Sequence, residues 1–189
     1  MRSRIILVCG LLAAAQVGCA SQEQPTGAPP AAAAAETAAP ASSAPASSAA
    51  PPVVSVPATL GFTGTTVDGK PFDGARLAGR PVVLWFWAPW CGTCAGQAAS
   101  VADARARYDG RVSVVGVAGL GDLEAMKEFV ADLDVASVPH VNDRAGAIWR
   151  KFAITQQSVY VFIDAAGTVV HKGWLDSTAF EERLAALAG

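Results

Sequence analysis

Apolar and polar positions along residues 58–189 form a pattern that predicts an α/β domain. The run Val82–Trp87 holds six consecutive apolar residues, which is typical of a strand buried on both faces. A second β-branched stretch at residues 111–119 predicts another strand, and an alanine-rich helical segment, residues 91–108, separates the two. This strand–helix–strand order implies parallel strands joined by a right-handed crossover.

The rest of the domain adds turns, helices and an antiparallel pair to this unit. The further predicted elements are a two-residue hairpin turn at Asp68-Gly69, a helix opened by Asp122 and running to Leu133, a short helix with Ile148, Trp149 and Phe152 facing inward, two strands joined by a turn at Asp164–Gly167, and a helix over Ser177–Leu187. Together they predict a mixed sheet with helices on both faces and an N-terminal β-hairpin extension.

The N-terminus has the pattern of a targeting segment. Arg2 and Arg4 precede the apolar run Ile5–Val17, which is too short to span a bilayer and suits a signal peptide. The following "QVGCA" resembles a bacterial lipobox and predicts lipidation of Cys19, so that residues 1–19 form a processed, membrane-anchoring segment. The alternative is a secreted protein cleaved nearby, with Cys19 inert or removed. Either way we expect the domain to work outside the cytoplasm.

Residues 20–57 consist largely of Ala, Pro and Ser and predict a disordered linker, because such a stretch buries too little apolar surface to order itself. The linker is either a tether that holds the domain away from the membrane or a spacer of no required length. The folded domain then spans 58–189, which suits one hydrophobic core. A net charge of −2 without a basic excess argues against nucleic acid as a partner, and we expect a monomer.

Cys91 and Cys94 are the only cysteines of the predicted domain, and they lie where the buried strand gives way to a helix. A thiol at a helix N-terminus has a depressed pKa, because free amides and the helix dipole stabilise the thiolate. Cys94 follows one helical turn later and faces the same side. We therefore expect Cys91 to be an exposed nucleophile and Cys94 the resolving thiol of a dithiol–disulfide exchange that needs no cofactor.

Two alternatives to a redox role of the cysteine pair stay open, a zinc site and a protein that only binds a partner. Tetrahedral zinc needs more ligands, and only His140, predicted in a loop, and His171, predicted in a strand, are available to complete such a site. Solvated or core positions explain both histidines more simply, and we expect no metal. A lipoprotein that only binds a partner would leave the cysteines dispensable.

The stretches "VVLWFWAPWCGTC" and "ITQQSVYVFIDAAG", with the predicted element order, resemble the thioredoxin superfamily. The likeness is to its extracytoplasmic TlpA-like and Dsb-like thiol–disulfide oxidoreductases and covers residues 58–189. The resemblance implies a thioredoxin-like fold with Trp90 packed beside the redox pair. It also implies that Gly92 and Thr93 surround the pair, and that a loop of Gln157, Ser158 and Val159 faces it and binds the substrate backbone.

Three departures from that family pattern surround the pair. Trp85 and Gln97 stand where relatives carry acids, so less negative charge opposes the Cys91 thiolate and the reduced form is favoured. Ser158 stands in the place of the family's cis-proline, and a trans bond with a rearranged loop is the simpler expectation. The Thr93 hydroxyl either donates to the thiolate or is merely tolerated in the first turn. Core packing alone explains Trp85 and Trp87.

The departures predict an oxidant of secreted proteins, since a stabilised dithiol form makes a disulfide more oxidising. The main alternative is a TlpA-type reductase that keeps extracytoplasmic thiols reduced, for instance in cytochrome c maturation. A peroxidase is disfavoured, because peroxiredoxins carry threonine three residues before the reactive cysteine and this chain has Ala88. The expected partners are protein thiols and disulfides, together with a redox partner that recycles the pair.

Overall fold

The computed structural model describes residues 55–189. The predicted signal peptide, the lipidation of Cys19 and the linker up to residue 54 lie outside the described residues and stay predictions. The helices and strands are β1 (Thr63–Thr65), β2 (Pro71–Asp73), β3 (Val82–Trp87), α1 (Gly92–Arg107), β4 (Ser113–Ala118), α2 (Leu123–Asp132), β5 (His140–Asn142), α3 (Ala147–Lys151), β6 (Val159–Ile163), β7 (Val169–Gly173) and α4 (Ser177–Ala188). Within 55–189, no helix has both the length and the apolar character needed to span a bilayer.

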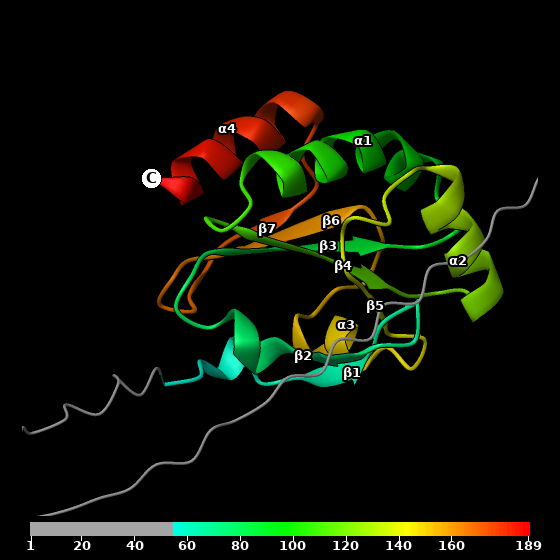
Figure 1. Ribbon diagram of the computed structural model, residues 1–189, viewed down its shortest axis with the longest axis horizontal. Coiled ribbons are helices and arrows are strands. Elements are labelled where there is room, and N and C mark those ends of the chain that lie inside the picture. Colours follow the sequence, from blue (N-terminus) through cyan, green and yellow to red (C-terminus); the bar gives the residue numbers. More distant parts are fainter. Residues whose placement is uncertain (1–54) are drawn as a thin grey trace, which may run out of the picture. The chain divides into compact units, whose positions relative to one another are not determined.

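A mixed five-stranded sheet in the order β5-β4-β3-β6-β7 forms the centre of the domain (Figure 1). β3 pairs in parallel with β4, and β4 with β5, whereas β6 lies antiparallel to both β3 and β7. The predicted bounds of the central strand are confirmed, and all six of its side chains are buried. Its continuous apolar sequence follows from this position, because the strand has neighbours on both edges and a core on each face.

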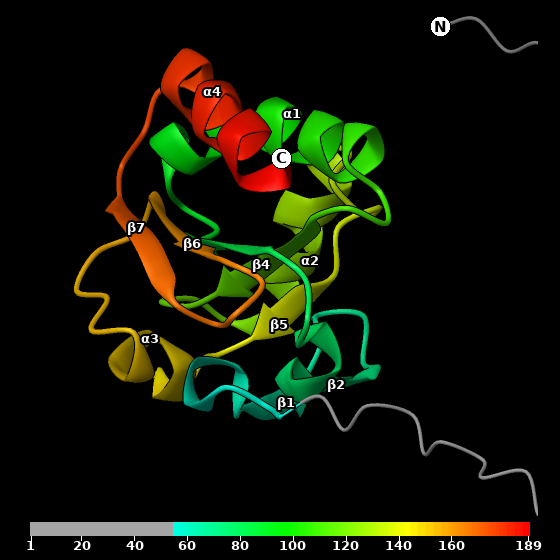
Figure 2. The same cartoon turned by 90° about the vertical axis from the view of Figure 1, so that its left-hand side faces the viewer.

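Alternate residues of β3 enter two hydrophobic cores, one on each face of the sheet. Trp85 and Trp87 join a core built with buried residues of α1, α2 and α4. Leu84 and Phe86 join the other, which α3 and the N-terminal segment complete. Figure 2 shows this layering, with α1 and α4 above the sheet and α3 and the β1–β2 hairpin below it. The predicted arrangement of helices on both faces is confirmed.

The predicted N-terminal hairpin is present as β1 and β2, but its loop is longer than the expected two-residue turn. The Thr66 amide donates to the Lys70 carbonyl at 2.8 Å, and the Gly69 amide donates to the Thr66 carbonyl at 2.9 Å. Gly69 has a φ of 87°, the left-handed conformation that a three-residue hairpin loop places at its last position. A bridge between Thr66 and Val141 joins the hairpin to β5, at the edge of the main sheet.

The prediction that His140 lies in a loop is wrong, because His140 is the first residue of the short strand β5. β5 has only three residues and directly follows Pro139, so its own sequence shows no alternation from which a strand can be recognised. It forms because Gly116, Val117 and Ala118 of β4 offer a free edge, on which residues 140–142 pair in parallel. The strand therefore depends on its neighbour more than on its own residues.

Candidate active site

The end of β3 and the start of α1 position the two cysteines. Cys91 is the N-cap residue of α1, with extended backbone angles (φ −89°, ψ 106°), and its Sγ accepts a hydrogen bond from the Cys94 amide at 3.0 Å. The Cys91 and Cys94 Cα atoms lie 5.2 Å apart, and the two sulfurs form a disulfide. A sulfur in the N-cap position receives a backbone donor that the helix cannot itself satisfy, which stabilises negative charge on Cys91.

The expectation that Cys91 is exposed is wrong. Its side chain is 5% exposed, and that of Cys94 is fully buried. The disulfide draws the two sulfurs together under the loop before β6, where Ser158 lies against both of them. Cys91 is among the residues that line a groove on the surface and Cys94 is not, so Cys91 is the cysteine that a partner approaches from this groove.

The side chain of Ser158 contacts both atoms of the redox pair. Its Oγ lies 3.1 Å from Cys91 Sγ and 3.2 Å from Cys94 Sγ, and the residue is 6% exposed. The Ser158 amide donates to the Phe86 carbonyl at 2.8 Å, which fixes the loop to the end of β3. A hydroxyl held in this place can donate to whichever sulfur carries charge after the disulfide opens.

The backbone at Ser158 has a conformation that excludes proline. Its φ is 64°, whereas the proline ring holds φ close to −65°. The loop is therefore built differently from one that carries proline at this position. A non-glycine residue in the left-handed region costs about 1–2 kcal/mol, so Ser158 is held there against its own preference.

Gln97 and Trp85 form a hydrogen-bonded chain that ends at the Ser158 loop. The Trp85 indole N–H donates to Gln97 Oε1 at 2.9 Å, and Gln97 Nε2 donates to the Ser158 carbonyl at 3.3 Å. The interpretation of Trp85 as core packing alone is wrong, because its indole fixes which way the Gln97 amide points. Trp85 and Gln97 thus form one neutral, buried unit that is hydrogen-bonded to the loop contacting the pair.

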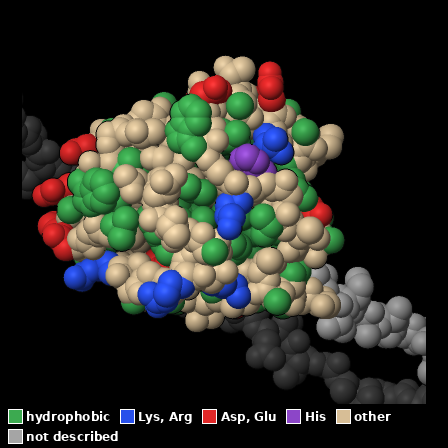
Figure 3. Space-filling view, turned by 180° about the vertical axis from the view of Figure 1, so that it is seen from behind, with side chains coloured by type: hydrophobic (Ala, Val, Ile, Leu, Met, Phe, Trp, Pro, Cys, Tyr) green, Lys and Arg blue, Asp and Glu red, His purple; other side chains and the backbone are tan. Residues whose placement is uncertain are grey.

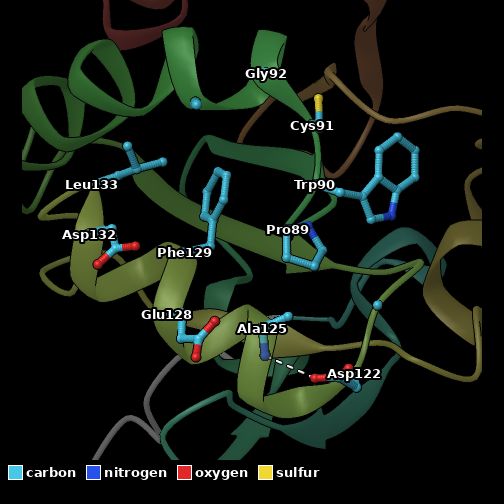
Figure 4. Close-up of a pocket in the computed structure, with 12 residues that line it drawn as sticks. Pro89, Trp90, Cys91, Gly92, Asp122, Ala125, Glu128, Phe129, Asp132 and Leu133 are labelled. Atoms are coloured by element: carbon cyan, nitrogen blue, oxygen red, sulfur yellow. Dashed lines mark hydrogen bonds between the residues drawn. The ribbon is translucent and has the colours of Figure 1, made fainter.

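Trp90 lies beside Cys91 at the surface and is 61% exposed. Its indole N–H donates to the Leu120 carbonyl at 2.7 Å, which holds the ring against the loop between β4 and α2. A groove of about 470 Å³ runs from Trp90 and Cys91 to α2, with Phe129 among its walls (Figure 4). Its volume falls within the range of clefts that hold ligands.

The other predicted site residues take supporting positions. Gly92 and Thr93 are exposed in the first turn of α1, Gln157 is half-buried, and Val159 is buried as the first residue of β6. Among the described residues, the groups that hydrogen-bond to Cys91 Sγ are the Ser158 hydroxyl and the Cys94 amide. The suggested donation from the Thr93 hydroxyl is therefore absent from this part of the chain, and Ser158 supplies the hydroxyl instead.

His140 lies in the core and contacts neither cysteine. Its Nδ1 accepts from the Trp87 indole at 3.1 Å, and its Nε2 lies 3.0 Å from the Val135 carbonyl, to which it donates as neutral imidazole. Burial lowers the pKa of His140 from 6.5 to about 4. Both ring nitrogens are thus engaged in holding β5 and its preceding loop against β3.

A comparison with protein-family models matches residues 34–186 to Redoxin. The chain belongs to the Redoxin family. The soluble secreted antigen MPT53 of Mycobacterium tuberculosis is 41% identical over 118 residues, which are 62% of this chain and 67% of that protein. The predicted relationship to the thioredoxin superfamily is confirmed.

Solved structures place this Redoxin chain in the thioredoxin-like fold. MTB DsbF, solved in mixed oxidized and reduced forms, has a TM-score of 0.66 at 42% identity and covers 70% of this chain and 99% of its own. A secreted Mycobacterium tuberculosis disulfide oxidoreductase homologous to E. coli DsbE has a TM-score of 0.63 at 37% identity, covering 68% and 98%. The predicted fold class is confirmed.

Proposed function

We propose that this chain is an extracytoplasmic thiol–disulfide oxidoreductase that works as an oxidant of secreted proteins. The observation that carries the direction is the Ser158 hydroxyl, which lies within 3.2 Å of both sulfurs. Together with the Cys94 amide it gives the Cys91 thiolate two donors, while Gln97 keeps the buried position behind the pair neutral. Donors that favour the thiolate stabilise the dithiol form and make the disulfide more oxidising.

The proposed reaction transfers two electrons from a substrate to the Cys91–Cys94 disulfide. A substrate thiolate attacks Cys91 Sγ, the bond to Cys94 breaks, and Cys94 leaves as a thiolate that takes up a proton. A second substrate thiolate then attacks the substrate sulfur of the mixed disulfide. Cys91 leaves as the thiolate, the substrate gains a disulfide, and the enzyme is left reduced. Cys91 is thus the sulfur that bonds to substrate, and Cys94 is the leaving thiol, which resolves the mixed disulfide only when exchange runs in the opposite direction.

The proposed location is outside the cytoplasm, with the domain anchored through lipidated Cys19 or released as a secreted protein. The pattern of residues 1–19 supports it, and so do the relatives, two of which are described as secreted. The proposed partners are protein thiols, and a second redox protein that restores the disulfide.

The direct test is oxidation of a reduced, unfolded protein whose activity requires its disulfides. The oxidised chain should restore that activity with one substrate disulfide formed per Cys91–Cys94 pair consumed, and Cys91→Ser should abolish it. Cys94→Ser, given a disulfide-bonded substrate in place of the reduced one, should accumulate a mixed disulfide through Cys91, because no resolving thiol remains. An enzyme that reduces substrate disulfides in the presence of a dithiol but forms none would contradict the proposal and favour the reductase alternative.

A further inference from the structure

The charged side chains that line the groove beside Cys91 are all acidic. Asp122, Glu128 and Asp132 are among the side chains that line it, and no Lys or Arg is among its described lining residues. Figure 4 shows Glu128 and Asp132 on α2 and Asp122 at the N-cap of that helix, across the groove from Cys91 and Trp90. Acidic side chains also gather along the edge of the molecule that α2 forms, as seen from behind in Figure 3.

Helix stability does not explain two of these acids. Glu128 and Asp132 are four residues apart on α2, a spacing at which like charges repel. Asp132 also ends the helix, where the dipole disfavours a carboxylate. Asp122 differs, because it caps α2 by accepting from the Ala125 amide at 2.9 Å.

No cation of the described chain neutralises Glu128 or Asp132 in an ion pair. The one lysine of α2, Lys127, pairs with Glu124 at 3.5 Å and lines a different cavity. The chain's own residues 20–57 contain two glutamates and no Lys or Arg, so this linker is a poor match for the groove. The carboxylates are therefore available to a cation from another molecule.

We propose that the groove selects substrate segments that carry a lysine or arginine close to the reacting cysteine. This inference rests on the proposed function and adds the substrate class. A segment whose thiol reaches Cys91 must pass the groove, where its apolar part meets Phe129 and Trp90 and its cation meets Glu128 and Asp132. From Asp122 to Asp132, α2 rises about 15 Å, which an extended chain covers in about five residues.

The test measures how fast single-cysteine peptides reduce the oxidised full chain. Three peptides differ only at one position three residues from the cysteine, which holds lysine, serine or glutamate. A neighbouring lysine also changes the reactivity of the peptide's own thiol. For each form of the enzyme we therefore take the rate with the lysine peptide divided by the rate with the serine peptide. This ratio is then compared between the native chain and a variant, so that the intrinsic reactivity of the peptide thiol cancels.

The ratio should be about fivefold higher for the native chain than for the double variant Glu128→Gln/Asp132→Asn, which is the size expected of two exposed ion pairs. Glu124→Gln is the matched control, since it removes a charge from α2 outside the groove, and it should keep the native ratio. Added salt should lower the native ratio toward that of the double variant, because exposed charges are screened.

Equal ratios in the native chain and the double variant would overturn the inference. So would a dimer of the chain that the double variant abolishes, because the groove would then belong to a second copy. These results leave the proposed function standing, since all three peptides are still oxidised. A disulfide that reacts with none of the peptides contradicts the proposed function itself, and the inference falls with it.

Discussion

Ser158 places its hydroxyl within hydrogen-bond distance of both sulfurs of the redox pair. Its identity as the departure from the family's proline was visible in the sequence, but its two sulfur contacts and its φ of 64° were not. The Trp85–Gln97–Ser158 chain was missed as well, since it joins residues 12 and 61 positions apart. The resemblance to the thioredoxin superfamily implies acids at positions 85 and 97, and the presence of Trp85 and Gln97 there was the signal available.

Removal of the Ser158 hydroxyl should make the pair less oxidising. Loss of a hydrogen bond to a charged group of about 1.5 kcal/mol corresponds to about 30 mV, so Ser158→Ala should shift the reduction potential by that amount to more negative values. Ser158→Gly should shift the potential equally, yet be about 1 kcal/mol more stable than Ser158→Ala, because glycine adopts a φ of 64° without strain. Glutathione equilibration and urea unfolding measure the two effects. An unchanged potential in both variants refutes the role of the hydroxyl.

A carboxylate in place of the Gln97 amide should oppose the thiolate. Gln97→Glu should lower the reduction potential by about 30 mV and raise the midpoint of the Cys91 thiolate titration, since like charges disfavour each other. Gln97→Met removes both hydrogen bonds of the amide without adding charge and serves as the uncharged control. Equal shifts in the two variants would show that packing, not charge, is responsible.

At the scale of elements, most segments were predictable from the sequence, and the short strand β5 was not. β3 was recognised with its bounds, because six consecutive apolar residues are typical of a buried strand. α2 was recognised because Asp122 precedes a helical pattern, and α4 because its apolar residues recur at helical spacing. β5 was missed because three residues after Pro139 carry no period of their own. Such an element is defined by the neighbour on which it pairs.

The cap of α4 gives a test at this scale. The Asp176 side chain accepts from the Ala179 amide at 2.8 Å, at the start of the helix that places Phe180 and Leu184 in the core over α1. Asp176→Ala should lower the free energy of unfolding by about 1 kcal/mol, whereas Asp176→Asn should keep most of it, because asparagine caps equally well. Chemical denaturation measures both, and equal losses would show that the cap is not the source.

At the scale of the whole molecule, the groove is the feature that sequence could not supply. Its walls come from the β3–α1 loop and from α2, two segments that are separated along the chain by α1 and β4. In the sequence alone, its acidic residues have the pattern of an ordinary solvent-exposed helix face. The position of the redox pair was predictable, because one local motif defines it. The surface that a substrate contacts beside the pair is formed only when these segments come together in the folded domain.

Stability of the molecule should depend on pH through His140. Because burial lowers its pKa from 6.5 to about 4, the unfolded chain binds a proton in this interval that the folded protein does not. The contribution of neutral His140 to the free energy of unfolding is therefore fully present above pH 6.5, and it is lost as the pH falls toward 4. From about pH 7 to about pH 5 the loss should be about 2 kcal/mol. In His140→Gln, measured by urea unfolding at both pH values, this part of the loss should disappear. An identical pH dependence in the variant contradicts the assignment.

The surroundings of Cys91 and Cys94 are proposed to make their disulfide an oxidant. The most direct measurement is the reduction potential of the pair, obtained by equilibrating the chain with glutathione buffers. We expect a value less negative than about −200 mV, closer to the strong oxidant DsbA than to thioredoxin. A value near that of thioredoxin, about −270 mV, would contradict it.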